Sequence, residues 1–280
     1  MIGGSSGRCR LCSESRPLQS SHLLPKALYR LIRAWSPPDH PDPIFGTMIG
    51  FRKTSRQVVD NLLCLPCEQR FHSEGENWVL KHCYRGKGSF RLQRILHKAT
   101  PLYTGDRVSL FAAQFISEIR SDQLLYFAAS VFWRAAVHEW HHGDHALRPM
   151  VIGTAYEEGL GRFLLGGAFP DHVAVLVRTA GESQPAPTLI FPFGGRQDTY
   201  HQYRFYIPGL LFDLIVGKRI PDYLLTMSIH RSPHLMTLSD QMGVDIKTKL
   251  LMLKELSEMQ PTERMRHFRS ILRRTGAERF

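Results

Sequence analysis

Two Cys-x-x-Cys pairs constrain the fold of this 280-residue chain more than any other feature of its sequence. Cys9 and Cys12 form the first pair, and Cys64 and Cys67 form the second. Four thiolates in two close pairs match the ligand set of a tetrahedral zinc ion, which would close the long loop between them. The pattern therefore predicts a structural Zn²⁺ site. The fifth cysteine, Cys83, is expected to be a buried free thiol.

The positive charge of the chain is concentrated around these pairs. The formal net charge is +11, and residues 1–100 hold 16 Lys and Arg against 7 Asp and Glu. Residues 260–280 form a second basic segment with six arginines. This distribution is typical of proteins that bind a phosphate backbone, so we expect a nucleic-acid partner. A solvated basic face is the alternative.

The remaining composition is that of a globular intracellular protein. The chain is 43% hydrophobic and 22% charged, which allows a sizeable core. No apolar run approaches the roughly 18 residues of a membrane span, and residues 1–7 lack the apolar stretch of a secretory signal. We therefore expect a cytoplasmic protein without a membrane partner, in which paired cysteines bind metal instead of forming disulfides.

Residues suited to hydrolysis lie beside the two cysteine pairs. His22 lies in a short segment that ends at Pro25, and a neutral imidazole can take a proton from water. After the second pair, Glu68, His72 and Glu76 follow at positions i, i+4 and i+8, which share one face of a helix. These side chains suit Mg²⁺ or Mn²⁺ better than a second zinc. Alternatively, His22 caps a turn and the two glutamates are ordinary solvated residues.

This layout resembles the HNH, or ββα-metal, endonuclease family. In that family a first Cys-x-x-Cys precedes a His-x-x-Pro segment, and a second one opens the helix that delivers metal ligands. The chain matches with His22 and Pro25, and with the segment from Asn61 through the second pair to His72. The resemblance covers about residues 8–80 and implies a ββα-metal fold with a zinc knuckle there.

The resemblance also implies residue roles. His22 corresponds to the general base, and Glu68 and His72, with Glu76, would hold a catalytic Mg²⁺ or Mn²⁺ ion. Asn61 takes the place of the family's middle asparagine, with Asp60 or neither residue as alternatives. The chain departs from the family at Ser21, where a metal ligand is usual, and at Glu68, where His or Asn is usual. A degenerate, non-catalytic site is therefore an open alternative.

We accordingly predict a metal-dependent HNH-type endonuclease that hydrolyses phosphodiester bonds, with DNA as the expected substrate over RNA. HNH modules fused to a further domain, and similar layouts in bacterial proteins of this size, imply a role in anti-phage defence or a mobile element. The alternative is a non-catalytic zinc-knuckle protein that binds nucleic acid. Residues 89–280 are expected to bind a protein partner or activator.

A competing motif occurs at residues 138–142. His138, Glu139 and His142 satisfy His-Glu-x-x-His, in which a helix presents two zinc-binding histidines and a catalytic glutamate. A five-residue pattern of this kind arises easily by chance in a His-rich stretch. We therefore rank a metalloprotease third among the possible functions. The favoured interpretation of the motif is a solvated helix end, where histidines interact favourably with the helix dipole.

The chain is predicted to be α+β, with a boundary near residues 85–89. The first domain, residues 1–88, is the HNH-like zinc-knuckle module, and residues 89–280 form a helical middle followed by a mixed α+β C-terminal part. Periodicity predicts helices over 25–35, from the second cysteine pair to about 82, and over 110–119, 124–140, 150–165 and 243–275. It predicts strands over 172–178, 188–192, 203–207, 209–217 and 224–230, with a tight turn at 193–196.

Overall fold

The computed structural model describes residues 6–35, 44–47, 50–53, 56–86, 89–147 and 149–248. It confirms a mixed α+β protein. Residues 242–248 are helical, so the predicted helix over 243–275 begins as expected, but most of it lies outside the described residues. The basic segment over 260–280 also lies outside them.

The first part of the chain contains a small antiparallel sheet of three strands in the order β1-β2-β5. The strands are β1 (Ser6–Arg8), β2 (Ser15–His22) and β5 (Val59–Cys64). Helix α1 (Lys26–Trp35) and the hairpin of β3 (Ile44–Thr47) and β4 (Gly50–Lys53) lie between β2 and β5 in the sequence. Helix α1 buries Leu28 and Ile32 on one face, as its periodicity predicts.

A continuous helical segment follows β5 directly and ends at His82, in agreement with the prediction. It consists of α2 (Leu65–Phe71), the π-helical turn η1 (His72–Glu76) and α3 (Asn77–His82). Pro66 lies in the first turn of α2, where its missing N–H leaves no hydrogen bond unmade. The π turn was not predicted, and π turns are frequent at functional sites.

The second part of the chain is built on a seven-stranded sheet in the order β11-β12-β13-β10-β14-β7-β6. Strands β10 and β14 are parallel, and the other neighbouring pairs are antiparallel. The strands are β6 (Tyr103–Thr104), β7 (Val108–Ala112), β10 (Val173–Ala180), β11 (Ile190–Arg196), β12 (His201–Ile207), β13 (Leu210–Val216) and β14 (Leu235–Ser239).

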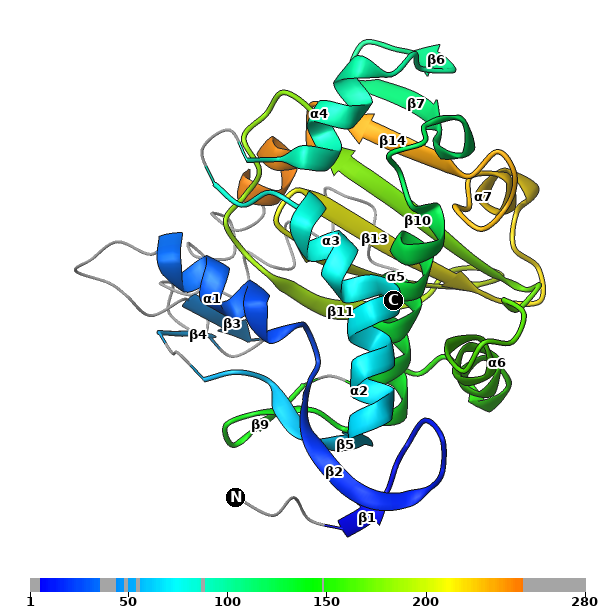
Figure 1. Cartoon of the computed structure of the whole chain (residues 1–280). Coiled ribbons are helices and arrows are strands. Elements are labelled where there is room, and N and C mark those ends of the chain that lie inside the picture. Colours follow the sequence, from blue (N-terminus) through cyan, green and yellow to red (C-terminus); the bar gives the residue numbers. More distant parts are fainter. Residues whose placement is uncertain are drawn as a thin grey trace.

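Helices and a small hairpin surround this sheet. The helices are α4 (Arg91–Lys98), the 3₁₀ turn η2 (Ala113–Phe115), α5 (Ser121–Val137), α6 (Thr154–Leu164) and α7 (Asp222–Thr226). Strands β8 (His141–His142) and β9 (His145–Ala146) pair after α5. In Figure 1, α5 lies between the sheet and the helix formed by α2 and α3.

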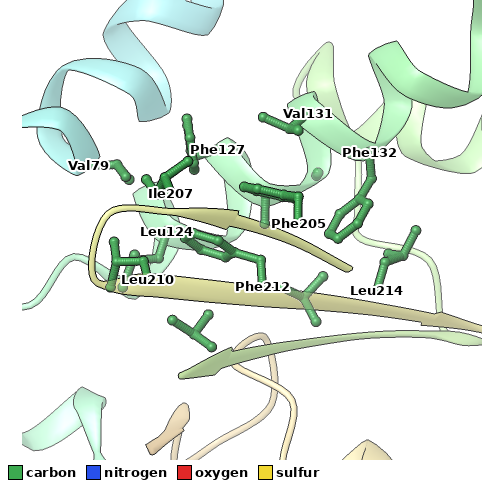
Figure 2. Packing of buried hydrophobic residues seen from close by; sticks show 14 of the residues in the cluster. Val79, Leu124, Phe127, Val131, Phe132, Phe205, Ile207, Leu210, Phe212 and Leu214 are labelled. Carbon is green, nitrogen blue, oxygen red and sulfur yellow. The ribbon is translucent and has the colours of Figure 1, made fainter. Parts of the chain in front are cut away.

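Helix α5 is the centre of the hydrophobic core. Every residue from Leu124 to Ala135 is buried, as expected for a helix that is apolar all round. Figure 2 shows Phe127 and Phe132 of α5 facing Phe205 and Phe212 of the β12–β13 hairpin. The ring centroids of Phe132 and Phe205 lie 4.9 Å apart, close to the edge-to-face geometry that aromatic pairs prefer.

Three predicted elements differ from the structure. The predicted helix over 110–119 is wrong, because β7 pairs with β14 and only the short turn η2 follows. The predicted strand over 224–230 is also wrong, because α7 begins after Pro221. The amide of Val175 in β10 donates its hydrogen bond to the Ser228 hydroxyl and not to the backbone of a neighbouring strand. The predicted tight turn over 193–196 lies inside β11, where Phe193 pairs with Arg204. At 110–119 and 193–196, strand pairing outweighs the local pattern.

The core continues across the predicted domain boundary. One cluster of buried side chains runs from Cys9 and Leu24 through Phe71 and Phe127 to Ile246. The helical middle is likewise not separate, because β6 and β7 belong to the large sheet. The division at residues 88 and 89 stays a prediction. Within the described residues, none of the helices combines the length and apolar character needed to cross a membrane.

Gly75 allows the π turn to lie directly against α5. A Cβ atom at this position would lie 2.8 Å from the backbone nitrogen of Phe127. Because both helices would have to separate, we expect Gly75→Ala to lower the free energy of unfolding by about 1–3 kcal/mol in urea denaturation. The matched control is Gly195→Ala, which meets no atom within 4 Å and should change stability by less than about 0.5 kcal/mol. Equal effects of the two substitutions would contradict this packing.

Candidate functional site

The four cysteines of the two pairs meet in space. The Sγ atoms of Cys9, Cys12, Cys64 and Cys67 all lie within 4.8 Å of one another, and the Sγ atoms of Cys12 and Cys64 are 3.7 Å apart. Zinc–sulfur bonds of about 2.3 Å in a tetrahedron separate the sulfurs by about 3.8 Å. The donor set therefore fits a structural zinc ion.

Strand pairing brings the cysteines together. Cys64 ends β5 opposite Leu18 of β2, and the loop between β1 and β2 carries the first pair. The Arg10 amide donates to the Leu62 carbonyl, and the Cys9 Sγ accepts the Cys64 amide at 3.4 Å. The Arg10 guanidinium also donates to the carbonyl of Val137, the last residue of α5. The cysteine loop is thus attached to both β5 and α5.

The electrostatics of the cluster favour a cation. Burial raises the pKa values of the Cys64 and Cys67 thiols. At Cys9 burial also acts to raise the pKa, but backbone amides that point at the sulfur outweigh it and lower the pKa to about 7. A divalent cation would offset the cost of several buried thiolates, which is how zinc binding couples to folding.

His22 lies at the other end of the same strand pair. It is the last residue of β2, opposite Val59, and its side chain is half-buried. Its Nε2 atom is 2.7 Å from the Oε1 atom of Gln57, so in this arrangement Nε2 carries the proton and Nδ1 keeps its lone pair. Burial lowers the pKa of His22 below 6.5; the hydrogen bond to Gln57 opposes this shift and the charge of Lys26 adds to it.

Ser21 has a structural role. Its side chain is fully buried, and its hydroxyl accepts the Leu63 amide hydrogen at 3.1 Å across the strand pair. The position where the HNH family usually has a metal ligand therefore points into the sheet in this chain.

The helix after the second cysteine pair places its three predicted ligands differently. Glu68 is half-buried, and its Oε1 atom is buried without a hydrogen-bond partner among the described residues. His72 is exposed at the start of the π turn. Glu76, at the end of that turn, accepts a hydrogen bond from Arg134 at 3.0 Å. The shared face expected for an uninterrupted α-helix is thus broken by the π turn.

Arg134 connects Glu76 with His22. Its side chain on α5 is 1% exposed, its Nη1 atom donates to the His22 carbonyl at 2.7 Å, and its guanidinium lies 5.2 Å from the ring centroid of Phe71. Neither Arg134 nor Gln57 was singled out from the sequence. Arg134 could have been noticed as a lone arginine in the apolar stretch of α5, whereas nothing in the sequence distinguishes Gln57.

The two remaining candidates lie on β5. Asp60 and Asn61 are exposed, and Asp60 pairs with His138, with 2.9 Å between carboxylate oxygen and Nε2. Burial acts to raise the pKa of Asp60, but hydrogen bonds from His138 and the Asn61 amide outweigh it and lower the pKa. Among the His, Cys, Asp and Glu side chains of the described residues, only the four cysteines bring three or more potential ligand atoms within 4.8 Å of one another.

The His-Glu-x-x-His motif is not on a helix. The predicted helix over 124–140 ends early, because α5 stops at Val137 and His138 is extended with φ −144° and ψ 141°. His138 contacts Asp60, whereas His142 contacts the carbonyl of Arg56. The two histidines therefore lack the common helical face that a zinc protease needs.

A cavity of about 520 Å³ lies apart from these residues. It is lined by Tyr84, Phe90, Gln93 and Arg94 on one side and by residues 182–185 on the other. None of the predicted site residues lines it, so it plays no part in the site around His22.

Comparison with known proteins identifies no relative that would assign a function. No protein-family model matches the chain, and neither the curated proteins nor the solved structures contain a match. The resemblance to HNH endonucleases therefore stays a prediction, and the site is interpreted from its own geometry.

The cysteine cluster predicts one bound zinc ion that stabilises the fold. We expect Cys64→Ser to abolish zinc retention during purification and to lower the thermal midpoint by at least about 5 °C, because metal affinity here contributes to folding. Metal analysis and thermal unfolding measure the two effects. Cys83→Ser is the matched control, since Cys83 is buried and lies outside the cluster. Zinc retained at full occupancy by Cys64→Ser would contradict the assignment.

The environment of His22 predicts a neutral ring at pH 7. Because the pKa of His22 is lowered in the folded state, the neutral ring's contribution to the free energy of unfolding is fully present above pH 6.5, the ordinary pKa of the ring. This contribution is lost as the pH falls below that value, since the unfolded chain then binds a proton more readily than the folded one. We expect nitrogen-detected NMR titration to give a pKa below 6.5 for His22 and a lower one in Gln57→Ala, since the hydrogen bond to Gln57 favours the charged ring. Titration of His22 at or above 6.5 would refute this environment.

Proposed function

We propose that the chain is a metal-dependent HNH-type endonuclease that hydrolyses phosphodiester bonds in nucleic acid. The observation that supports this most directly is that the N-terminal part holds both a half-buried His22, whose pKa is lowered by burial, and a buried Glu68 oxygen without a hydrogen-bond partner among the described residues. The Glu68 charge acts to raise the His22 pKa but does not outweigh burial. A neutral base and a carboxylate that lacks a partner are the groups that water activation next to a cation requires.

His22 would act through Nδ1. The Gln57 oxygen holds the Nε2 proton, so Nδ1 offers its lone pair to a water molecule. The Nδ1 atom would take one proton from this water, the water oxygen would form a bond to phosphorus, and the bond from phosphorus to the 3′ oxygen would break, with the 3′ oxygen taking a proton from solvent. The protonated His22 would then return its proton to solvent before the next turnover, which its lowered pKa favours at pH 7.

Glu68 fits a Mg²⁺ or Mn²⁺ ion, and Glu76 does not. Magnesium sites often use one or two protein carboxylates and complete their coordination with water and substrate phosphate. The free Oε1 atom of Glu68 could supply that carboxylate, whereas Glu76 is occupied by Arg134; His72 and Asn61 are exposed. When bound, the ion would stabilise charge on the phosphate and on the leaving oxygen.

Exposed cations of the N-terminal part support a polyanionic substrate. The exposed side chains are Arg8 of β1, Arg10 of the cysteine loop, Arg16 of β2, and Lys26 and Arg30 of α1. The charge of Lys26 reaches His22, which places a cation close to the proposed base.

DNA is the proposed substrate on the resemblance alone. The same is true of a role in anti-phage defence or a mobile element, of a partner or activator bound by residues 89–280, and of a cytoplasmic location.

The second candidate is a non-catalytic nucleic-acid-binding protein. The burial of Ser21 and the pairing of Glu76 with Arg134 favour it, because both remove potential metal ligands. It differs from the first candidate in predicting salt-sensitive DNA binding without cleavage, whether or not His22 is present.

Nicking of supercoiled plasmid distinguishes the two candidates. We expect the purified protein to nick DNA with Mg²⁺ or Mn²⁺ but not with EDTA, and His22→Ala to reduce the rate at least about 100-fold, since it removes the general base. His172→Ala is the control, because His172 is an exposed histidine beside β10. If the wild type does not nick DNA while both proteins still bind it, the nuclease proposal is wrong and the non-catalytic nucleic-acid-binding protein is favoured.

Glu68→Gln tests the proposed ligand in the same assay. We expect it to lose nicking and to weaken Mn²⁺ binding measured by electron paramagnetic resonance, while zinc content is unchanged. Unaltered Mn²⁺ affinity would remove Glu68 from the metal site.

A further inference from the structure

Arg134 is a buried cation in the most apolar helix of the protein. Its side chain is 1% exposed, and its neighbours in α5 from Leu124 to Ala135 are also buried. A buried ion pair is often no more stabilising than well-packed apolar side chains of the same volume. Stability of the core therefore does not explain an arginine at this position.

The guanidinium group holds two other elements, β2 and the π turn, in one geometry relative to α5. Its Nη1 atom donates to the His22 carbonyl at 2.7 Å, its Nη2 atom donates to the Glu76 carboxylate at 3.0 Å, and its Nε atom donates to the Ser130 carbonyl at 3.2 Å. The planar fork fixes the directions of these bonds, which a lysine ammonium cannot do. The end of β2 and the π turn are thereby set at a fixed separation.

The π turn and Gly75 serve the same contact. Glu76 is the last residue of η1, and Gly75 beside it lets this turn approach the backbone of α5. Trp140 holds the backbone of Arg134, because its Nε1 atom donates to the Arg134 carbonyl at 2.8 Å. Arg134 is thus fixed from both ends, and its head group faces the residue proposed as the base.

We propose that Arg134 is a positioning residue for phosphodiester cleavage, through which α5 aligns His22 with the helix that carries Glu68. This inference rests on the proposed nuclease function. It means that cleavage by residues of the N-terminal part depends on a side chain outside residues 1–88. Arg134 touches neither substrate nor metal and acts through the His22 carbonyl and Glu76.

The test compares kcat and KM for a DNA oligonucleotide among Arg134→Met, Arg134→Lys and Glu76→Gln in the full-length protein. Arg204→Met is the matched control, because Arg204 forms an ion pair of 2.7 Å with buried Asp213 in the large sheet. All variants are assayed at a temperature where circular dichroism and zinc content match those of the wild type.

We expect Arg134→Met to lower kcat about 10- to 100-fold with KM within about twofold of the wild-type value, since misplacing a reacting group affects chemistry more than binding. Arg134→Lys should recover part of kcat, because it keeps the charge but not both hydrogen bonds, and Glu76→Gln should fall between Arg134→Met and the wild type. If Arg134→Met does not fold, the other two variants carry the same comparison.

A kcat equal to that of Arg204→Met in every Arg134 and Glu76 variant overturns the positioning role while leaving the nuclease proposal intact. A fall in kcat that only follows the loss of thermal stability, with Arg204→Met falling equally, also overturns it. Absence of cleavage by the wild type overturns the nuclease proposal itself, and the positioning role with it.

Discussion

The burial of α5 is the constraint on which the arrangement of the other elements depends. One side of the helix packs on the β12–β13 hairpin, and another packs on the π turn and α3 (Figures 1 and 2). Each large apolar side chain buried there contributes about 1.5–3 kcal/mol. Since the same helix fills both contacts, a shift of α5 would loosen the sheet and the N-terminal part together. This explains why one hydrophobic cluster spans both parts of the chain.

The strand pair β2–β5 separates two kinds of chemistry. Cys64 lies at one end of it opposite Leu18, and His22 lies at the other end opposite Val59. Four residues of a strand span about 13 Å, so the cysteine cluster cannot take part in water activation at His22. A zinc ion in that cluster would instead hold β2 and β5 in register, and Ser21 strengthens the same pairing from inside the sheet.

Burial gives the site around His22 its electrostatic character. It disfavours a charged imidazole, which lowers the pKa of His22, and it strengthens the attraction between Arg134 and Glu76. Among the described residues, the Oε1 atom of Glu68 is buried without a hydrogen-bond partner, and so is the hydroxyl of Tyr29, whose ring centroid lies 6.1 Å from that of His22. An unsatisfied carboxylate oxygen in such a place is unfavourable unless a cation or a donor completes it.

The sequence alone determined the elements and ligands that depend on short-range patterns. It identified the cysteine cluster from ligand spacing, the helix after Cys64 from its proline and periodicity, and four strands of the large sheet from alternating and β-branched residues. It did not determine the path of residues 110–119, because whether that segment is strand or helix depends on β14 as a neighbour. Nor could it assign Gln57 and Arg134 to His22, since both contacts join residues far apart in the chain: the β2–β5 pairing brings Gln57 to His22, and the packing of the buried helix α5 brings Arg134 there.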